Sequence, residues 1–266
     1  MHTVIINPLQ FIFMKLSFTN IYLLLFCLLI GVSCEKNAAS ADSTAAPNNG
    51  GAGGSLARFT IVGNYLYMVD MHMLQVVDIT NPATPEVKGS VYAGFDIETI
   101  FSYKNKLYLG ASNGMYIYSI DNPLSPVKES DITHFRACDP VVSNDTVSYV
   151  TLRSQGTNCG SNKDILNIYD VKDPKKPKLI KEVAMKSPYG LGIRDKALFI
   201  CEGTNGLITF DLSDPYKPEK TTEFKDETFY DVIPYGDVLI AFIQKGVCFF
   251  DISDPLKPVF LSKVQG

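Results

Sequence analysis

The chain has 266 residues, of which 46% are hydrophobic and 20% are charged, with 24 basic groups, 28 acidic groups and a formal net charge of −4. This mild acidity argues against a nucleic-acid-binding protein and against a basic patch that holds anionic lipid. It leaves ample length and apolar content for a single hydrophobic core.

The amino-terminal segment is typical of an export signal. Met14 and Lys15 precede an apolar run at residues 21–30, which is shorter than the roughly 20 residues that span a bilayer. The run ends at Gly31-Val32-Ser33-Cys34, which resembles a bacterial lipobox, although Gly31 stands where that motif usually has leucine. We therefore predict a signal peptide at residues 1–33, with Met14 as a candidate start, and lipidation of Cys34. An ordinary secretory peptide cleaved near the same place is the alternative.

Residues 34–55 are predicted to be a lipidated flexible tether. They consist largely of Ala, Ser, Asn and Gly, ending in the run Asn-Asn-Gly-Gly-Ala-Gly-Gly at 48–54, and have little to bury. Several acyl chains on Cys34 would give durable anchoring. Removing residues 1–33 takes away Lys15 and no acidic group, so the mature net charge becomes −5. We expect an exported protein anchored by lipid to the bacterial envelope, at the outer membrane or cell surface.

Residues 56–266 contain an eight-residue pattern that recurs five times. Each copy reads Asp-x-x-Asp/Asn-Pro-x-x-Pro, apart from a serine at the start of the second. The copies lie at residues 78–85, 119–126, 170–177, 211–218 and 251–258. Their first prolines are 41, 51, 41 and 40 residues apart. Such spacing indicates a repeat protein.

Each repeat unit is predicted to hold four strands. Short β-branched and aromatic runs mark the second strand at 65–69, 106–109, 147–152, 197–201 and 238–243, and the third ends at each pattern, as at 206–210 and 246–250. First strands are expected at 189–193 and 230–233, and a fourth at 259–264. The Asp or Asn side chain can bond amides two residues on, and each proline removes an N–H donor, so the chain must turn there.

A four-stranded unit of about 40 residues has the size of one propeller blade. We therefore predict an all-β fold, a β-propeller of five four-stranded blades. The strands are apolar on both faces, so we expect two neighbours to cover each blade. Ring closure would rest on blade 1 packing against blade 5, helped by residues 259–264 or 56–58. An open ring, or pairing with a second chain, remains the alternative.

The segment Leu-Gln-Val-Val-Asp-Ile-Thr-Asn-Pro at 74–82, with its trailing Pro85, resembles the LVIVD repeat of bacterial and archaeal cell-surface proteins. The resemblance covers all five units, and Ser119 departs from it where the other units have Asp. It implies propeller blades and a surface location, and it carries no biochemical activity over to this chain.

The third unit is longer by ten residues, at 154–163, between its second and third strands. In a propeller this loop and the entry to the blade lie on one face, so we predict a disulfide between Cys138 and Cys159, worth roughly 3 kcal/mol. Two free thiols or a metal pair are the alternatives. Cys201 and Cys248 fall inside strands and are interpreted as small core residues.

The sequence contains no GxSxG, HExxH or Walker motif, so we expect no catalytic residue, cofactor or metal. Asp211 with Asp214, and Asp251 with Asp254, are interpreted as turn formers rather than calcium ligands.

The loops after the second strands and the entries to the first strands should share one rim, flanked by aromatic residues. We predict that this rim binds an envelope protein or a glycan. Its candidate residues are Asp70, His72, Glu98, Arg136, Asp139, Arg153, Glu202 and Asp231. A plain solvated rim, a scaffold subunit of an envelope complex, and a hydrolase or lyase that uses Asp139 with His72 or Asp231 are the alternatives.

Overall fold

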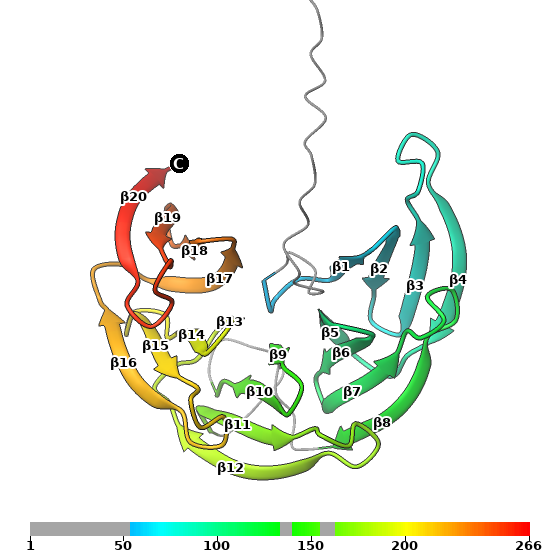
Figure 1. Cartoon of the computed structure of the whole chain (residues 1–266), viewed down its shortest axis with the longest axis horizontal. Helices are drawn as coiled ribbons and strands as arrows, with labels where there is room; N and C mark the ends of the chain where they lie inside the picture. Colours follow the sequence, from blue (N-terminus) through cyan, green and yellow to red (C-terminus); the bar gives the residue numbers. More distant parts are fainter. Residues whose placement is uncertain (1–53, 134–139, 155–162) are drawn as a thin grey trace, which may run out of the picture. The chain divides into compact units, whose positions relative to one another are not determined.

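The computed structural model describes residues 54–133, 140–154 and 163–266. The chain divides into residues 1–45 and 46–266, and the second unit contains all of the described residues. Within them lie twenty strands in five four-stranded antiparallel sheets, arranged as the blades of a propeller (Figure 1). None of the described segments forms a helix that is long and apolar enough to cross a membrane.

Each blade is an antiparallel meander whose strands follow one another in chain order. Blade 1 contains β1 (Phe59–Val62), β2 (Tyr65–Val69), β3 (Met73–Asp78) and β4 (Glu86–Tyr92). Blade 2 contains β5 (Ile97–Tyr103), β6 (Lys106–Ala111), β7 (Gly114–Ser119) and β8 (Val127–Thr133). Blade 3 contains β9 (Val141–Ser143), β10 (Val147–Leu152), β11 (Ile165–Asp170) and β12 (Lys178–Ala184). Blade 4 contains β13 (Leu191–Arg194), β14 (Ala197–Cys201), β15 (Leu207–Asp211) and β16 (Glu219–Phe224). Blade 5 contains β17 (Phe229–Tyr235), β18 (Val238–Ile243), β19 (Gly246–Asp251) and β20 (Val259–Gln265).

The predicted second strands are confirmed. Four of the five have the predicted bounds, and β6 extends two residues further than expected. The strands β10 and β14 are buried along their whole length, whereas the outermost strands, such as β12 and β20, are largely exposed. Burial therefore decreases from the second and third strands of a blade to its outer edge.

The Asp-x-x-Asp-Pro pattern forms the turn that the sequence predicts. In blade 4 an Asp211 oxygen accepts the amide N–H of Ser213 at 2.8 Å, and an Asp214 oxygen accepts that of Tyr216 at 3.0 Å. In blade 2 the Ser119 hydroxyl accepts the amide of Asp121 at 3.2 Å, so serine replaces aspartate in the same role. The carboxylates are thus used in turns, and the described residues contain no group of three metal-binding side chains.

Four hydrophobic clusters fill the spaces between consecutive blades. Buried tyrosines also tie neighbouring blades through the proline turns. The Tyr67 hydroxyl of blade 1 donates to the Pro123 carbonyl of blade 2 at 3.0 Å, and that of Tyr149 donates to Pro215 of blade 4 at 2.7 Å. The turn therefore ends a strand and also joins two blades.

The prediction that every blade is covered by two neighbours is wrong for blades 1 and 5. Substantial contacts between described elements join blades 1 to 2, 2 to 3, 3 to 4 and 4 to 5, and none joins blade 5 to blade 1. Figure 1 shows the resulting opening between β1–β4 and β17–β20. The predicted help from residues 259–264 is also wrong, because β20 is exposed throughout. Four blade interfaces are therefore formed, and the ring is open at the fifth position, between blades 5 and 1.

Candidate functional site

The loops after the second strands lie beside the connections between blades, as the sequence predicts. Backbone hydrogen bonds join loop to connection in blades 1, 4 and 5: the Ala93 amide donates to the His72 carbonyl at 2.8 Å, Gly203 to Phe229 at 3.0 Å, and Gln244 to Thr228 at 3.1 Å. We call this side of the propeller the loop face. The proline turns and the hairpins between first and second strands lie on the opposite side.

Asp70 shapes the loop between β2 and β3. Its carboxylate accepts the amide N–H of His72 at 3.0 Å and that of Met73 at 2.8 Å. These hydrogen bonds to backbone amides hold the pKa of Asp70 below its usual value. The carboxylate therefore supports the loop that presents the neighbouring side chains.

Those neighbours form an aromatic cluster, which we define as Met71, His72, Tyr92 and Phe95. The centroid of the His72 ring lies 5.3 Å from that of Phe95 and 6.3 Å from that of Tyr92. Met71, Tyr92 and Phe95 are 55%, 65% and 54% exposed. Aromatic residues and methionine are enriched in protein interfaces, and here they lie in the β2–β3 loop, at the end of β4 and in the connection to β5.

Glu98 lies in β5, close to this cluster in sequence and half-buried. Burial raises the pKa of its carboxyl, Arg58 opposes that rise, and Asp96 adds to it. Asp96 itself accepts a hydrogen bond from the Ser112 hydroxyl at 3.2 Å, which links the entry of blade 2 to its own loop.

Arg153 stands at the other side of the loop face, directly after β10. The carbon of its guanidinium lies 3.7 Å from the centroid of the Tyr189 ring, a cation–π contact. The Tyr189 ring meets that of Tyr230 edge to face at 5.1 Å, so the contacts continue from blade 3 to blade 5. Among the described residues, the contact that holds Arg153 is this stacking on Tyr189.

Two predicted rim residues are less exposed than expected, since Glu202 is buried and Asp231 is half-buried. Glu202 is 2% exposed, and its carboxylate accepts the Lys186 amide N–H at 2.7 Å, so it supports a connection and does not meet solvent. Asp231 in β17 is half-buried, and its carboxylate contacts the Ser55 hydroxyl. Periodicity placed both residues next to loops, but it could not show that the connecting segments fold over them.

Asp231 holds the segment that enters blade 1. Its carboxylate accepts hydrogen bonds from the Ser55 hydroxyl at 3.4 Å and from the Leu56 amide, while Ser55 Oγ accepts the Leu191 amide at 2.7 Å. The next carbonyl, of Ala57, accepts the Ile100 amide at 2.8 Å. The entering segment thus joins blades 2, 4 and 5. Burial raises the pKa of Asp231 to about 6, despite these hydrogen bonds.

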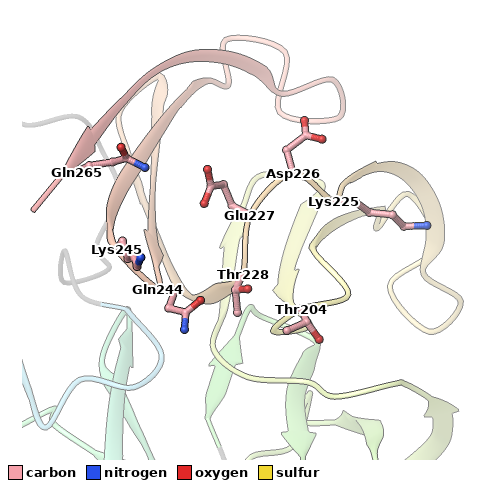
Figure 2. Close-up of a pocket in the computed structure, with 8 residues that line it drawn as sticks. All are labelled: Thr204, Lys225, Asp226, Glu227, Thr228, Gln244, Lys245 and Gln265. Carbon is pink, nitrogen blue, oxygen red and sulfur yellow. The ribbon is translucent and has the colours of Figure 1, made fainter.

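A polar hollow of about 320 Å³ opens where loops of blades 4 and 5 meet (Figure 2). Its lining consists of polar and charged side chains: Thr204, Lys225, Asp226, Glu227, Thr228, Gln244, Lys245 and Gln265. Glu227 pairs with Lys263, and Lys225 pairs with Glu223 at 3.0 Å. Sequence reasoning missed this hollow because its residues lie in short polar connections that look like ordinary turns.

Arg136, Asp139 and the predicted Cys138–Cys159 disulfide lie outside the described residues. Both proposed acid–base pairs, Asp139 with His72 and Asp139 with Asp231, therefore include a residue outside the described ranges. His72 contacts Tyr92, Phe95 and the Gly94 carbonyl, whereas Asp231 contacts the segment that enters blade 1. His72 and Asp231 therefore contact different groups of residues.

The LVIVD repeat family matches residues 53–93, which contain blade 1. No curated protein matches the sequence. Among solved structures, the designed protein Ika8 is 10% identical with a TM-score of 0.56, covering 78% of this chain and 61% of its own. A functionally unknown protein from Desulfotomaculum acetoxidans is 12% identical (TM-score 0.57; 76% and 66% covered). The periplasmic gluconolactonase PpgL of Pseudomonas aeruginosa is 11% identical (TM-score 0.57; 76% and 68% covered). At these identities the likeness shows the fold alone, and the chain spans about two thirds or less of the first two of these proteins.

Proposed function

We propose that this five-bladed propeller, whose first blade carries an LVIVD repeat, is a non-catalytic recognition module that binds a protein partner through its loop face. The observation that carries this proposal is the aromatic cluster of Met71, His72, Tyr92 and Phe95, in which Met71, Tyr92 and Phe95 are exposed at the loop end of blade 1 and its connection to blade 2.

The cluster has the physical character of a binding anchor. The side chains of the cluster gather where a hydrogen-bonded loop meets the end of β4, so little conformational entropy is lost when a partner covers them. Truncation of such anchors typically costs 2 kcal/mol or more, about 30-fold in affinity. Asp70 adds negative charge at the edge of the cluster, which favours a partner with a basic rim.

The second part of the proposal concerns location. The run Gly31-Val32-Ser33-Cys34 and the glycine-rich segment that follows support export and lipidation of Cys34, with a tether that joins the propeller to the envelope. Labelling cells with an alkyne fatty acid tests this proposal. Label should be incorporated by the normal chain and lost in Cys34→Ala, and label retained in that variant would contradict lipidation.

Quantitative capture from envelope extracts tests the binding face. Full chains that carry Tyr92→Ala or Phe95→Ala should lose the captured partner at least tenfold, because each change removes an anchor. Leu179→Ala is the matched control, since Leu179 is 48% exposed on the outer strand β12. Equal capture by all three variants would contradict the proposed face.

A glycan partner is the second candidate, and the polar hollow in Figure 2 favours it. Hydroxyl-rich ligands need convergent donors and acceptors, which Thr228, Glu227 and Gln244 provide there. A glycan array would show binding that Gln244→Ala weakens while Phe95→Ala leaves it unchanged. The reverse pattern would favour a protein partner on the aromatic cluster.

A further inference from the structure

The open ring leaves one sheet face of blade 5 uncovered. In blades 1 to 4 the third residue of the second strand is a buried aromatic that packs toward the next blade: Tyr67, Tyr108, Tyr149 and Phe199. The equivalent residue of blade 5 is Ile240, which is only half-buried. We call this side of a blade its forward face.

The forward face of blade 5 is apolar and accessible. Phe242 alternates with the buried Ala241 and Ile243 along β18, so it lies on the same face as Ile240. Phe242 is 54% exposed, and Tyr235 at the end of β17 is 64% exposed. At the position equivalent to Phe242 in blades 1, 3 and 4, the side chains of Val69, Thr151 and Cys201 are all buried.

Blade 1 leaves uncovered the face that packs against the preceding blade in the later blades. We call this side of a blade its backward face. Phe59 and Ile61 flank the buried Thr60 on β1 and are 58% and 47% exposed. In register with them on β2 lie the half-buried Met68 and Leu66. The equivalent leucines of later blades, Leu107, Leu198 and Leu239, are all fully buried against the preceding blade.

We propose that these two faces bind each other between copies of this chain, with the forward face of blade 5 in one copy on the backward face of blade 1 in another. The four internal interfaces show that a forward face fits the backward face of the next repeat, and every copy displays one unused face of each kind. Both uncovered faces are apolar, with Tyr235, Ile240 and Phe242 on one and Phe59 and Ile61 on the other. Neither face therefore requires a charged partner.

The geometry has a consequence for the assembly. Because the two faces differ, the contact is heterologous, so copies associate head to tail into closed rings or filaments rather than into an isologous dimer. The residues that carry this contact, Phe59, Ile61, Ile240 and Phe242, do not belong to the aromatic cluster, although Tyr92 of that cluster lies opposite Met73 on the same backward face of blade 1. A failure of assembly would leave the proposed recognition function untouched.

Cysteine crosslinking distinguishes the occupants of the opening. Copies of the full chain that carry Phe59→Cys, mixed with copies that carry Phe242→Cys, should form a mixed disulfide dimer, whereas neither variant alone should do so. The double variant, diluted and oxidised, reports closure within one chain. A crosslinked monomer from it, or no mixed dimer, would overturn the proposal.

Sedimentation of the purified chain provides the second test. The unmodified chain should form species larger than a monomer at micromolar concentration, and Phe242→Lys should lose them. Leu261→Lys is the matched control, since Leu261 is 53% exposed on β20 of the same blade and should keep them. A monomeric unmodified chain would overturn the proposal and leave the opening to a different protein.

Discussion

Replacing the half-buried Asp231 by asparagine should stabilise the propeller above pH 6 and lose that advantage in acid. Asparagine keeps an acceptor oxygen for the Ser55 hydroxyl and the Leu56 amide, and it removes the ionisable group. The change therefore isolates the cost of holding a carboxylate charge inside the ring.

The magnitude follows from the pKa, which burial raises from 3.8 to about 6. The folded state holds its proton more tightly than the unfolded state, so the contribution of Asp231 to stability falls as pH rises from about 4 to about 6 and stays constant above that. Each pKa unit corresponds to about 1.4 kcal/mol, which makes the penalty at neutral pH about 3 kcal/mol. Below the unfolded pKa the penalty disappears.

Urea unfolding of both chains at pH 7.5 and pH 4 measures this difference. Asp231→Asn should be more stable by about 2 to 3 kcal/mol at pH 7.5 and nearly equal at pH 4. Asp226→Asn, at an exposed carboxylate in the connection before β17, should show no such dependence. An Asp231→Asn effect that is the same at both pH values would refute the reasoning.

Three further predictions concern packing. Tyr149→Phe removes the hydroxyl that donates to a prolyl carbonyl of the next blade, and should lower the unfolding free energy by about 1 kcal/mol in urea; an unchanged midpoint would contradict that role. Gly206→Ala places a methyl group against a backbone carbonyl at φ +107° and should cost about 1 to 3 kcal/mol, more than Gly236→Ala, which meets open space at φ +56°. Burial raises the pKa of the Cys201 and Cys248 thiols, so Ellman's reagent should modify neither in the folded chain. After unfolding without reductant, the predicted Cys138–Cys159 disulfide would leave Cys201 and Cys248 as the two reactive thiols of the mature lipidated chain. Additional reactive thiols would contradict that disulfide.

The fold was predictable because each repeat carries its own local signals. Asp211 and Asp214 bond the amides that a turn requires, and the strands before and after the turn have the predicted order. Such signals are local in sequence, and five copies in phase remove the ambiguity of a single short apolar run. Ser119 shows why the pattern tolerates change, since a hydroxyl accepts the same amide.

The opening and the buried rim residues were not predictable in this way. Apolar residues on both faces of β2 and β18 predict that blades 1 and 5 each pack between two neighbours. Phe242 is nevertheless exposed, because closure of the ring depends on the curvature of all blades together, which no single repeat determines. Glu202 and Asp231 illustrate a second limit. Their burial depends on segments distant in sequence, such as the one that carries Ser55, and no repeat pattern encodes those segments.

The two sides of the propeller divide the requirements of stability and recognition. On the turn side, the carbonyls of Pro123 and Pro215 accept hydrogen bonds from tyrosines of the preceding blade, so a change there alters the packing between blades. On the loop face, Tyr92 and Phe95 protrude from the surface, and no buried cluster depends on them. Substitutions in the aromatic cluster should therefore change binding without changing stability, whereas substitutions at the turns should change both.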